Sequence, residues 1–290
     1  MTQIAREGAL APDGNGTFSA AAFDDPAIND AGQLAFTGFL TGTSGGAADN
    51  LGVFRGSGGA LTQIARGGAA PPEGNGTFFS FGIPNLNDLG QVAFVGSLTG
   101  TSGASSDDTG IYIGTGSGLT KVAREGDPAH DGDGVFSSSA IQSEPAINNL
   151  GQVAFEADYT GNSGGTAEDN LILRGTNSSD LIDIAREGDS APGGNGTLGS
   201  TFRGPAINDF GRAAFETSIS GASGGSLDDE RIFSGTGGSL TEIQREAEAA
   251  PDGNGVFNTT LSTAVSINNS NRVAFQADLR DTAGGSADDT

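Results

Sequence analysis

The sequence predicts an all-β protein, a β-propeller with five blades of which the last is incomplete. Three observations support this prediction: an eleven-residue motif that occurs five times, steps of 58 to 61 residues between its copies, and short apolar runs separated by glycine-rich turns. A period of this length that holds four strand-sized runs is typical of a propeller blade. The predicted repeats are approximately 1–62, 63–120, 121–182, 183–241 and 242–290, within one repeat domain covering 1–290.

Four runs in each period have the length and composition of strands. In the first complete period they are residues 17–23, 33–40, 51–55 and 61–66. No run repeats apolar residues at the 3.6-residue spacing of a helix over ten residues, so almost no helix is expected. A β-solenoid with three rungs per period is the alternative, but the three thirds of the period do not resemble one another.

The repeated motif reads PAINDAGQLAF at residues 26–36. Its glycine is expected at positive φ, where a side chain is costly, and the fifth copy has Asn271 there, a residue that tolerates the same conformation. The leading asparagine is expected to cap the turn, and the phenylalanine to pack between neighbouring sheets. The repeated residues are Asn29, Gly32, Phe36, Asn87, Gly90, Phe94, Asn148, Gly151, Phe155, Asn208, Gly211, Phe215, Asn268 and Phe275.

The predicted strands do not complete five blades. Residues 2–6 supply one outer strand, four full sets follow, and residues 256–261 and 272–279 supply two more, which leaves one strand position empty. An unpaired edge invites another chain to add a strand. The residues expected to take part in assembly are Thr2, Gln3, Ile4, Ala5, Asp288, Asp289 and Thr290.

The composition excludes several classes of function. With 13 basic and 36 acidic residues the net charge is −23, which disfavours nucleic acid and anionic membranes as partners. No apolar run is long enough for a membrane helix, so no membrane insertion is expected. The absence of cysteine and the single histidine, His130, exclude a thiol nucleophile and the usual serine–histidine triads.

A glycine-rich turn precedes the first strand of each period. It reads Asp13-Gly-Asn-Gly16 in the first copy, and Gly193 replaces the acidic residue in the fourth. Carboxylate and amide oxygens on alternate residues suit Ca²⁺, whereas Asp-Gly and Asn-Gly dipeptides also form turns without any metal. Both interpretations stay open. The candidate calcium ligands are Asp13, Asn15, Asp131, Asp133, Asp252 and Asn254.

An arginine ends each fourth strand, at Arg6, Arg66, Arg124, Arg186 and Arg245. We expect each to hold an acidic or amide group of the next repeat, as a latch between blades that needs the forked guanidinium. A ring of arginines that binds an anion is the alternative. Acidic pairs also recur, and five equivalent copies favour a structural role over catalysis. These pairs are Asp49–Asn50, Asp107–Asp108, Asp169–Asn170, Asp228–Asp229 and Asp288–Asp289.

The Asn-x-x-Gly-x-x-Ala-Phe unit, in five copies over nearly the whole chain, resembles a family of bacterial exported tandem-repeat proteins named for an NxxG…AF signature. The resemblance implies a β-propeller-like architecture and an extracellular or cell-surface location in a bacterium. It implies no catalytic residues.

These features predict a non-enzymatic extracellular scaffold that assembles head-to-tail into filaments, with the incomplete last blade receiving a strand from another copy. The expected partner is the protein itself, with a surface glycan or a protein as further candidates. Two alternatives stay open: a monomeric propeller that binds a protein, a glycan or Ca²⁺, and a polysaccharide-acting enzyme. An enzyme would need one repeat to break the pattern, and the third repeat diverges most, at Asp127, His130, Asp133 and Glu144.

Overall fold

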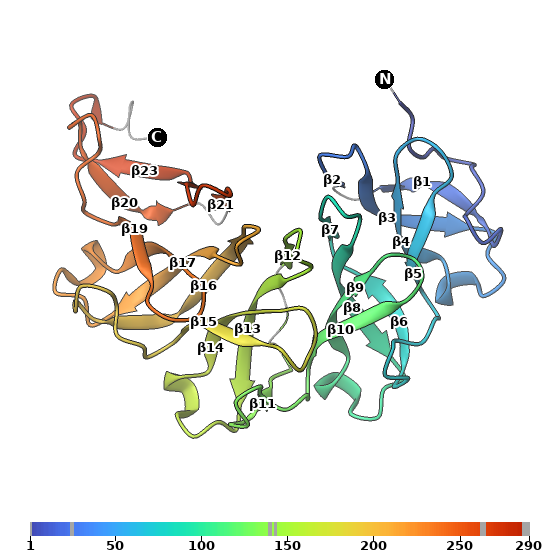
Figure 1. Ribbon diagram of the computed structural model, residues 1–290, viewed down its shortest axis with the longest axis horizontal. Coiled ribbons are helices and arrows are strands. Elements are labelled where there is room, and N and C mark those ends of the chain that lie inside the picture. Colours follow the sequence, from blue (N-terminus) through green and yellow to red (C-terminus); the bar gives the residue numbers. More distant parts are fainter. Residues whose placement is uncertain (1, 24–25, 139–140, 142–143, 262–264, 286–290) are drawn as a thin grey trace. The chain divides into compact units, whose positions relative to one another are not determined.

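The computed structural model describes residues 2–23, 26–138, 141, 144–261 and 265–285. Within these residues the chain is all-β, which confirms the predicted class, and its strands form antiparallel sheets (Figure 1). The helices are single 3₁₀ turns, and none in the described part is long enough to cross a membrane. They are η1 (Gly46–Ala48), η2 (Ala104–Ser106), η3 (Gly165–Ala167) and η4 (Gly225–Leu227).

The chain forms two compact units, Met1–Val153 with Gly175–Leu181 (unit 1) and Ala154–Arg174 with Ile182–Thr290 (unit 2). The strands of the first sheet in unit 1 are β1 (Thr17–Phe23), β2 (Ala27–Ile28), β3 (Leu34–Thr41), β4 (Leu51–Gly56) and β5 (Thr62–Arg66). Those of the second are β6 (Thr77–Phe81), β7 (Asn85–Leu86), β8 (Val92–Thr99), β9 (Thr109–Gly114) and β10 (Leu119–Arg124). Two short strands follow, β11 (Val135–Phe136) and β12 (Ala146–Ile147).

Unit 2 repeats this arrangement. It contains most of β13 (Val153–Thr160) and β14 (Asn170–Gly175), then β15 (Ile182–Arg186) beside β14. The next sheet has β16 (Thr197–Ile207), β17 (Ala213–Ser220), β18 (Glu230–Gly235) and β19 (Thr241–Arg245) in that order. The last strands are β20 (Val256–Leu261), β21 (Ser266–Ile267), β22 (Val273–Ala274) and β23 (Ala277–Arg280).

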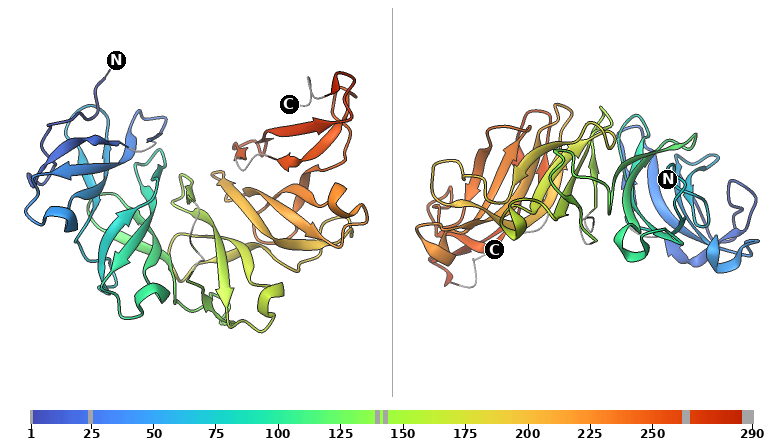
Figure 2. Two further views of the ribbon diagram at one scale, coloured as in Figure 1. Left: turned by 180° about the vertical axis from the view of Figure 1, so that it is seen from behind. Right: turned by 90° about the horizontal axis from the view of Figure 1, so that it is seen from below.

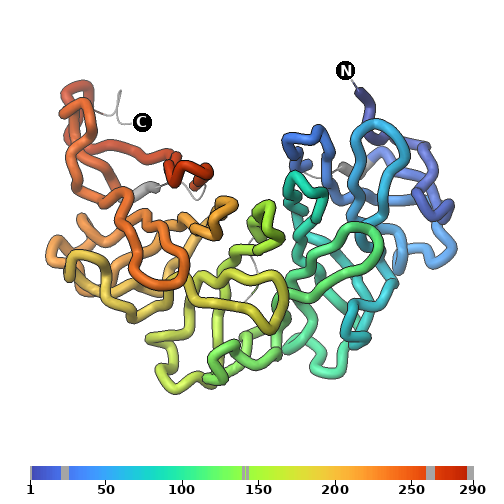
Figure 3. Tube along the Cα trace, in the orientation of Figure 1, coloured from blue at the N-terminus to red at the C-terminus, as the bar shows by residue number. Residues whose placement is uncertain are grey.

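The complete sheets share one topology, in which strands that follow each other in sequence lie side by side. The order is β1-β3-β4-β5 in the first sheet and β16-β17-β18-β19 in the fourth, and β2 pairs with the start of β3. The chain finishes each of these sheets before it enters the next (Figures 2 and 3). Short connections between antiparallel neighbours explain why glycine-rich turns separate the strands.

Two predicted strands differ from the structure. Residues 2–6 are not a strand, because no strand in the described part of the chain pairs with them, although Ile4 and Ala5 still pack on the Phe18–Phe36–Phe54 cluster. The predicted strand 272–279 divides into β22, which pairs with β21, and β23, which pairs with β20. The number of blades in a closed ring stays a prediction.

The predicted turn chemistry of the motif is confirmed. Gly32, Gly90, Gly151 and Gly211 have φ values from 71° to 76°, and Asn271 has φ 59°. The asparagine side chain caps the turn: Asn87 Oδ1 accepts a hydrogen bond from the backbone N–H of Gln91 at 2.9 Å.

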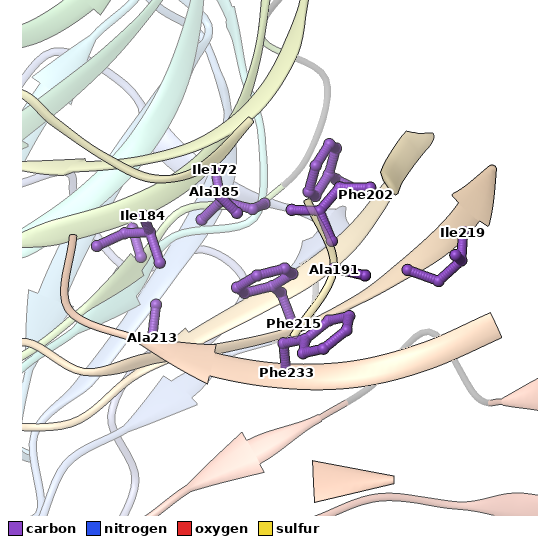
Figure 4. Close-up of a cluster of buried hydrophobic side chains, with 11 residues drawn as sticks. Ile172, Ile184, Ala185, Ala191, Phe202, Ala213, Phe215, Ile219 and Phe233 are labelled. Atoms are coloured by element: carbon purple, nitrogen blue, oxygen red, sulfur yellow. The ribbon is translucent and has the colours of Figure 1, made fainter. Parts of the chain in front are cut away.

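Two of the repeated phenylalanines, Phe94 and Phe215, pack between neighbouring sheets of one unit, as predicted, whereas Phe36 packs with Phe18 and Phe54 of its own sheet. In unit 2, Phe202, Phe215 and Phe233 of one sheet meet Ile172 and Ile184 of the preceding one (Figure 4). In unit 1, Phe78, Phe94 and Tyr112 form the same kind of core with residues of β3, β4 and β5. A sheet with one apolar face against its neighbour needs this packing for stability.

Candidate functional site

The loops predicted to bind calcium use their oxygens for hydrogen bonds within the protein. Asp13 Oδ1 accepts the N–H of Asn15 at 2.9 Å, and Asp13 Oδ2 pairs with Arg66 at 3.0 Å. Asn15 Oδ1 accepts the N–H of Ser44 at 2.8 Å, while its Nδ2 donates to Asp49 at 2.7 Å. Asp131 and Asp252 accept the N–H of Asp133 and Asn254 in the same way, each at 3.0 Å. This geometry favours the turn interpretation, and calcium at these residues remains only a prediction.

The arginines that end the fourth strands bind groups of their own sheet, so the predicted latch between blades is wrong. Arg124 is 3% exposed; its Nε donates to the carbonyl of Asp107 at 2.6 Å, and its Nη atoms bind Glu73 and the carbonyl of Asn75 at 2.7 and 3.0 Å. Residues 73–75 lead into the sheet that β10 ends. The Arg124 guanidinium therefore links the loop before β6 and the loop before β9 to the end of β10, all within one sheet.

The equivalent arginines of the other repeats make partly different contacts. Arg66 repeats the contacts of Arg124 with Asp13, Asn15 and the carbonyl of Asp49. Arg186 binds Asp183 at 2.9 Å and lies over the ring of Tyr159, Arg245 binds Asp228, and Arg6 is exposed.

One acidic pair was assigned to the wrong residues. The first acid of each pair follows the 3₁₀ turn, where Asp49, Asp107 and Asp228 are the C-caps of η1, η2 and η4. In the third repeat this residue is Glu168, not Asp169. Asp169 instead corresponds to Asn50, Asp108 and Asp229, whose carbonyls likewise accept the N–H of a residue near the end of the preceding strand.

The residues predicted for assembly divide into two groups. Asp288, Asp289 and Thr290 lie outside the described residues. Gln3, Ile4 and Ala5, with Pro26, Leu34 and Phe36, line a mainly apolar cavity of about 200 Å³ in unit 1. Thr2 is exposed.

The sequence analysis missed two glutamates that break the repeat pattern. Glu156 and Glu216 each follow the Ala-Phe pair of the motif, where the other copies have Thr37, Val95 and Gln276. In the first sheet the residue at this position contacts the next sheet: Thr37 donates to the carbonyl of Gly82, just after β6, at 3.2 Å. A charged residue at an inward position of a predicted strand was the signal that could have revealed them.

Two consecutive residues of β16 bind the two glutamates, one each. Arg203 Nη1 donates to Glu216 Oε1 at 3.0 Å, and the backbone N–H of Gly204 donates to Glu156 Oε1 at 2.8 Å. Strand β16 can serve both because it is irregular here: its register with β17 shifts between Arg203 and Ala206, and Gly204 has φ 54°. Only glycine adopts that conformation without strain.

The pair is little exposed, and this controls its charge. The Glu216 side chain is 2% exposed, and its Oε2 is buried without a hydrogen-bond partner among the described residues. Burial, with the nearby charge of Glu230, raises the pKa of Glu216 to about 7, although Arg203 opposes the shift. Burial also raises the pKa of Glu156, opposed by the Gly204 N–H and the charge of Arg203. Two carboxyl groups of this kind beside one arginine are suited to proton transfer.

The profile of the family of unknown function DUF7453 matches residues 1–191 and 143–290. The chain belongs to this family. That membership does not test the resemblance to the NxxG…AF family or the bacterial surface location, which stay predictions. No curated protein matches the chain.

Several solved structures are similar to this chain. The Penicillium chrysogenum α-L-arabinanase has 12% identity and a TM-score of 0.39, over 92% of this chain and 75% of that one. The Fusarium graminearum α-L-arabinofuranosidase has 12% identity and a TM-score of 0.37, over 92% and 76%. The Trypanosoma rangeli sialidase has 9% identity and a TM-score of 0.39, over 98% and 48%.

These comparisons contradict two predictions made from the sequence: that the protein is a non-enzymatic scaffold forming filaments, and that it is not an enzyme. The three structures named above are those of an arabinanase, an arabinofuranosidase and a sialidase. At such identities a shared fold does not define an activity, so a function for this chain has to rest on its own residues.

Proposed function

We propose that the protein is an enzyme that cleaves glycosidic bonds by general acid and base catalysis, with Glu216 as the proton donor and Glu156 as the second carboxylate. One observation carries the proposal. Two glutamates occupy the same position of two successive repeats, and the consecutive residues Arg203 and Gly204 bind one each.

The residues available to the chain favour this chemistry. Hydrolysis of a glycosidic bond needs only two carboxyl groups and a water molecule. The chain has no cysteine and one histidine, so nucleophilic catalysis by a cysteine or by a histidine-activated serine has little support. A carboxylate pair is the acid–base device that remains.

Burial raises the pKa of both glutamates, and each has a different partner. Glu216, with its pKa raised to about 7, keeps its proton in about half of the molecules at pH 7 and can donate it to the oxygen of the leaving sugar. The pKa of Glu156 is raised mainly by burial, while the Gly204 N–H and the charge of Arg203 oppose that rise and favour the ionised form. As a carboxylate it can activate water or attack the sugar carbon. Arg203, whose side chain is 41% exposed, is the solvent-facing partner of Glu216.

The test is the release of reducing ends from a panel of α- and β-linked polysaccharides and aryl glycosides. The variants are Glu216→Gln and Glu156→Gln, which keep the shape of the side chain and remove its ionisation. Each should lower kcat/KM on a cleaved substrate at least about 100-fold, the usual contribution of a positioned acid or base. The exposed Asp30→Asn variant, matched in charge, should keep full activity. Full activity of Glu216→Gln, or no cleavage across the panel by the folded protein, would overturn the proposal.

A further inference from the structure

Three sheets place an aspartate beside a glutamate at the same edge. The pairs are Asp108–Glu125, Asp169–Glu187 and Asp229–Glu246. The aspartate comes just before or at the start of the third strand, and the glutamate directly follows the fourth. Burial raises the pKa of Glu125 and of Glu187, and the neighbouring carboxyl groups of Asp108 and Asp169 raise them further.

Each glutamate accepts a hydrogen bond from the aspartate of its pair or from the residue after it. The N–H of Thr109 donates to Glu125 Oε2, and the N–H of Asp229 donates to Glu246 Oε2, both at 3.1 Å. In the third sheet, Asn170 Nδ2 donates to Asp169 and to Glu187, at 2.6 and 3.1 Å. Each carboxyl group is therefore directed toward the aspartate of its pair.

The first sheet lacks the whole arrangement. It has Asn50 and Gly67 at the two acidic positions, and Leu51 where the other sheets have Thr109, Asn170 and Glu230. The positions correspond, because the Gly67 N–H donates to the Leu51 carbonyl as the Glu125 N–H does to that of Thr109. The first sheet still forms its four strands, so the fold of a sheet does not need the pair. The first sheet thus has no carboxylate at either position, and only Asn50 keeps a side-chain oxygen, which is the difference expected if the acidic residues serve a ligand rather than the fold.

The fourth sheet supplies a second, independent observation. Glu246 is completely buried, and its Oε1 has no hydrogen-bond partner among the described residues. Leaving a buried carboxylate oxygen without a donor or a cation is unfavourable. A cavity of about 300 Å³ lies beside it, lined by Glu242, Arg245, Glu246, Ala247 and Glu248. Burial and the neighbouring Asp229 raise the pKa of Glu246, so the protein does not fully compensate this negative charge.

We propose that each of the three pairs binds one divalent cation of the calcium class. Two carboxylates offer up to four oxygens, and the side chain after the aspartate adds an oxygen at Thr109 or Asn170, with water completing the six to eight ligands that Ca²⁺ takes. These sites are separate from the glycine-rich loops, where Asp13 and Asn15 already accept hydrogen bonds within the protein. They also do not depend on Glu156 and Glu216, so this proposal stands apart from the proposed function.

Isothermal titration of the chelator-stripped full chain with CaCl₂ tests the proposal. Three ions per chain should bind, and Glu246→Gln should lower the number to two. Glu125→Gln combined with Glu246→Gln should lower it to one. The Asp30→Asn variant removes one exposed charge and should keep all three sites.

A second variant and a second measurement distinguish the loss of an ion site from unfolding of the variant. Asp229→Asn should lose the same single site as Glu246→Gln, with the far-UV circular dichroism of the wild type. Ca²⁺ should raise the Tm of the wild type more than that of either variant, since only the folded state holds the site. The proposal is overturned if the wild type binds neither Ca²⁺ nor Mg²⁺ at about 1 mM, which would mean that the pairs share a proton. It is also overturned if Glu246→Gln binds as many ions as the wild type.

Discussion

Asn87 donates a hydrogen bond from Nδ2 to the backbone carbonyl of Asn148, 61 residues further along the chain, at 2.8 Å. The equivalent bond joins Asn29 to Asn87 at 2.8 Å, and in unit 2 it joins Asn208 to Asn268 at 3.1 Å. The repeated asparagine thus closes its own turn through Oδ1 and ties that turn to the next one through Nδ2. This double use explains the repeated asparagine at Asn29, Asn87 and Asn208.

Removing the Asn87 side chain should destabilise the protein. Asn87 is 4% exposed and makes hydrogen bonds with Asn148, Gln91 Oε1 and the Gln91 N–H. Asn87→Ala leaves buried partners unsatisfied, so the free energy of unfolding in urea should fall by about 2–3 kcal/mol. Leu89→Ala, in the same turn but 70% exposed, is the control and should change it by less than about 0.5 kcal/mol. Equal effects of the two variants would show that the asparagine is not a structural tie.

Asparagine should replace the motif glycine more easily in the first copy than in the second. A Cβ on Gly32 meets nothing within 4 Å, whereas one on Gly90 would lie 2.6 Å from Arg55 Nη1. Gly32→Asn keeps a tolerated left-handed turn, as Asn271 does, and should cost less than about 1 kcal/mol. Gly90→Asn must also displace Arg55 from the carbonyl of Gly90, which adds about 1 kcal/mol. Thermal unfolding distinguishes the two, and an equal Tm would contradict the account.

Lysine should not replace Arg124. Three nitrogens of this arginine bind Asp107, Glu73 and Asn75, and an ammonium group cannot reproduce the fork. Arg124→Lys should lower the free energy of unfolding by about 1–3 kcal/mol. A double-mutant cycle with Glu73→Gln should show coupling, because both groups bind within one sheet. An unchanged Tm would rule out this bridge as a source of stability.

The stability of the protein should fall as the pH rises between about 4.5 and 7. Folding raises the pKa of Glu216 from 4.5 to about 7, so in this window the folded state binds more protons than the unfolded state. Above pH 7 the raised pKa lowers the free energy of unfolding by at most about 3 kcal/mol. Below pH 4.5, where Glu216 is protonated in both the folded and the unfolded state, this loss disappears. Urea unfolding of Glu216→Gln should show a weaker pH dependence than the wild type. Some pH dependence should remain in Glu216→Gln, because burial also raises the pKa of Glu125 to about 7.

The sequence was a good guide wherever structure is set locally. The turn around Asn29 and Gly32 depends on one side chain and one backbone conformation, so its residues could be interpreted directly. The strand at residues 17–23 was likewise predicted with its observed limits.

Pairings over long distances were harder to predict. The partner of Arg124 depends on which loops the sheet brings together, and the sequence does not say whether Glu73 belongs to the same sheet or the next. The acidic residue after η3 was predicted to be Asp169 but is Glu168. A difference of one residue in loop length cannot be recognised from the sequence, because the hydrogen bonds of the turn define the position. Glu156 and Glu216 lie inside strands, and their burial and their partners depend on how β16 packs against β13 and β17, which the sequence does not specify.

The protonation of Glu216 tests the central claim most directly. A ¹³C NMR titration of the glutamate carboxyl carbons, with Glu216→Gln to assign the signal, measures its pKa in the folded protein. We expect a midpoint near pH 7, which makes Glu216 a proton donor at neutral pH. A midpoint at the ordinary glutamate value of about 4.3 would contradict this assignment, because Glu216 would then be ionised and could not serve as the acid.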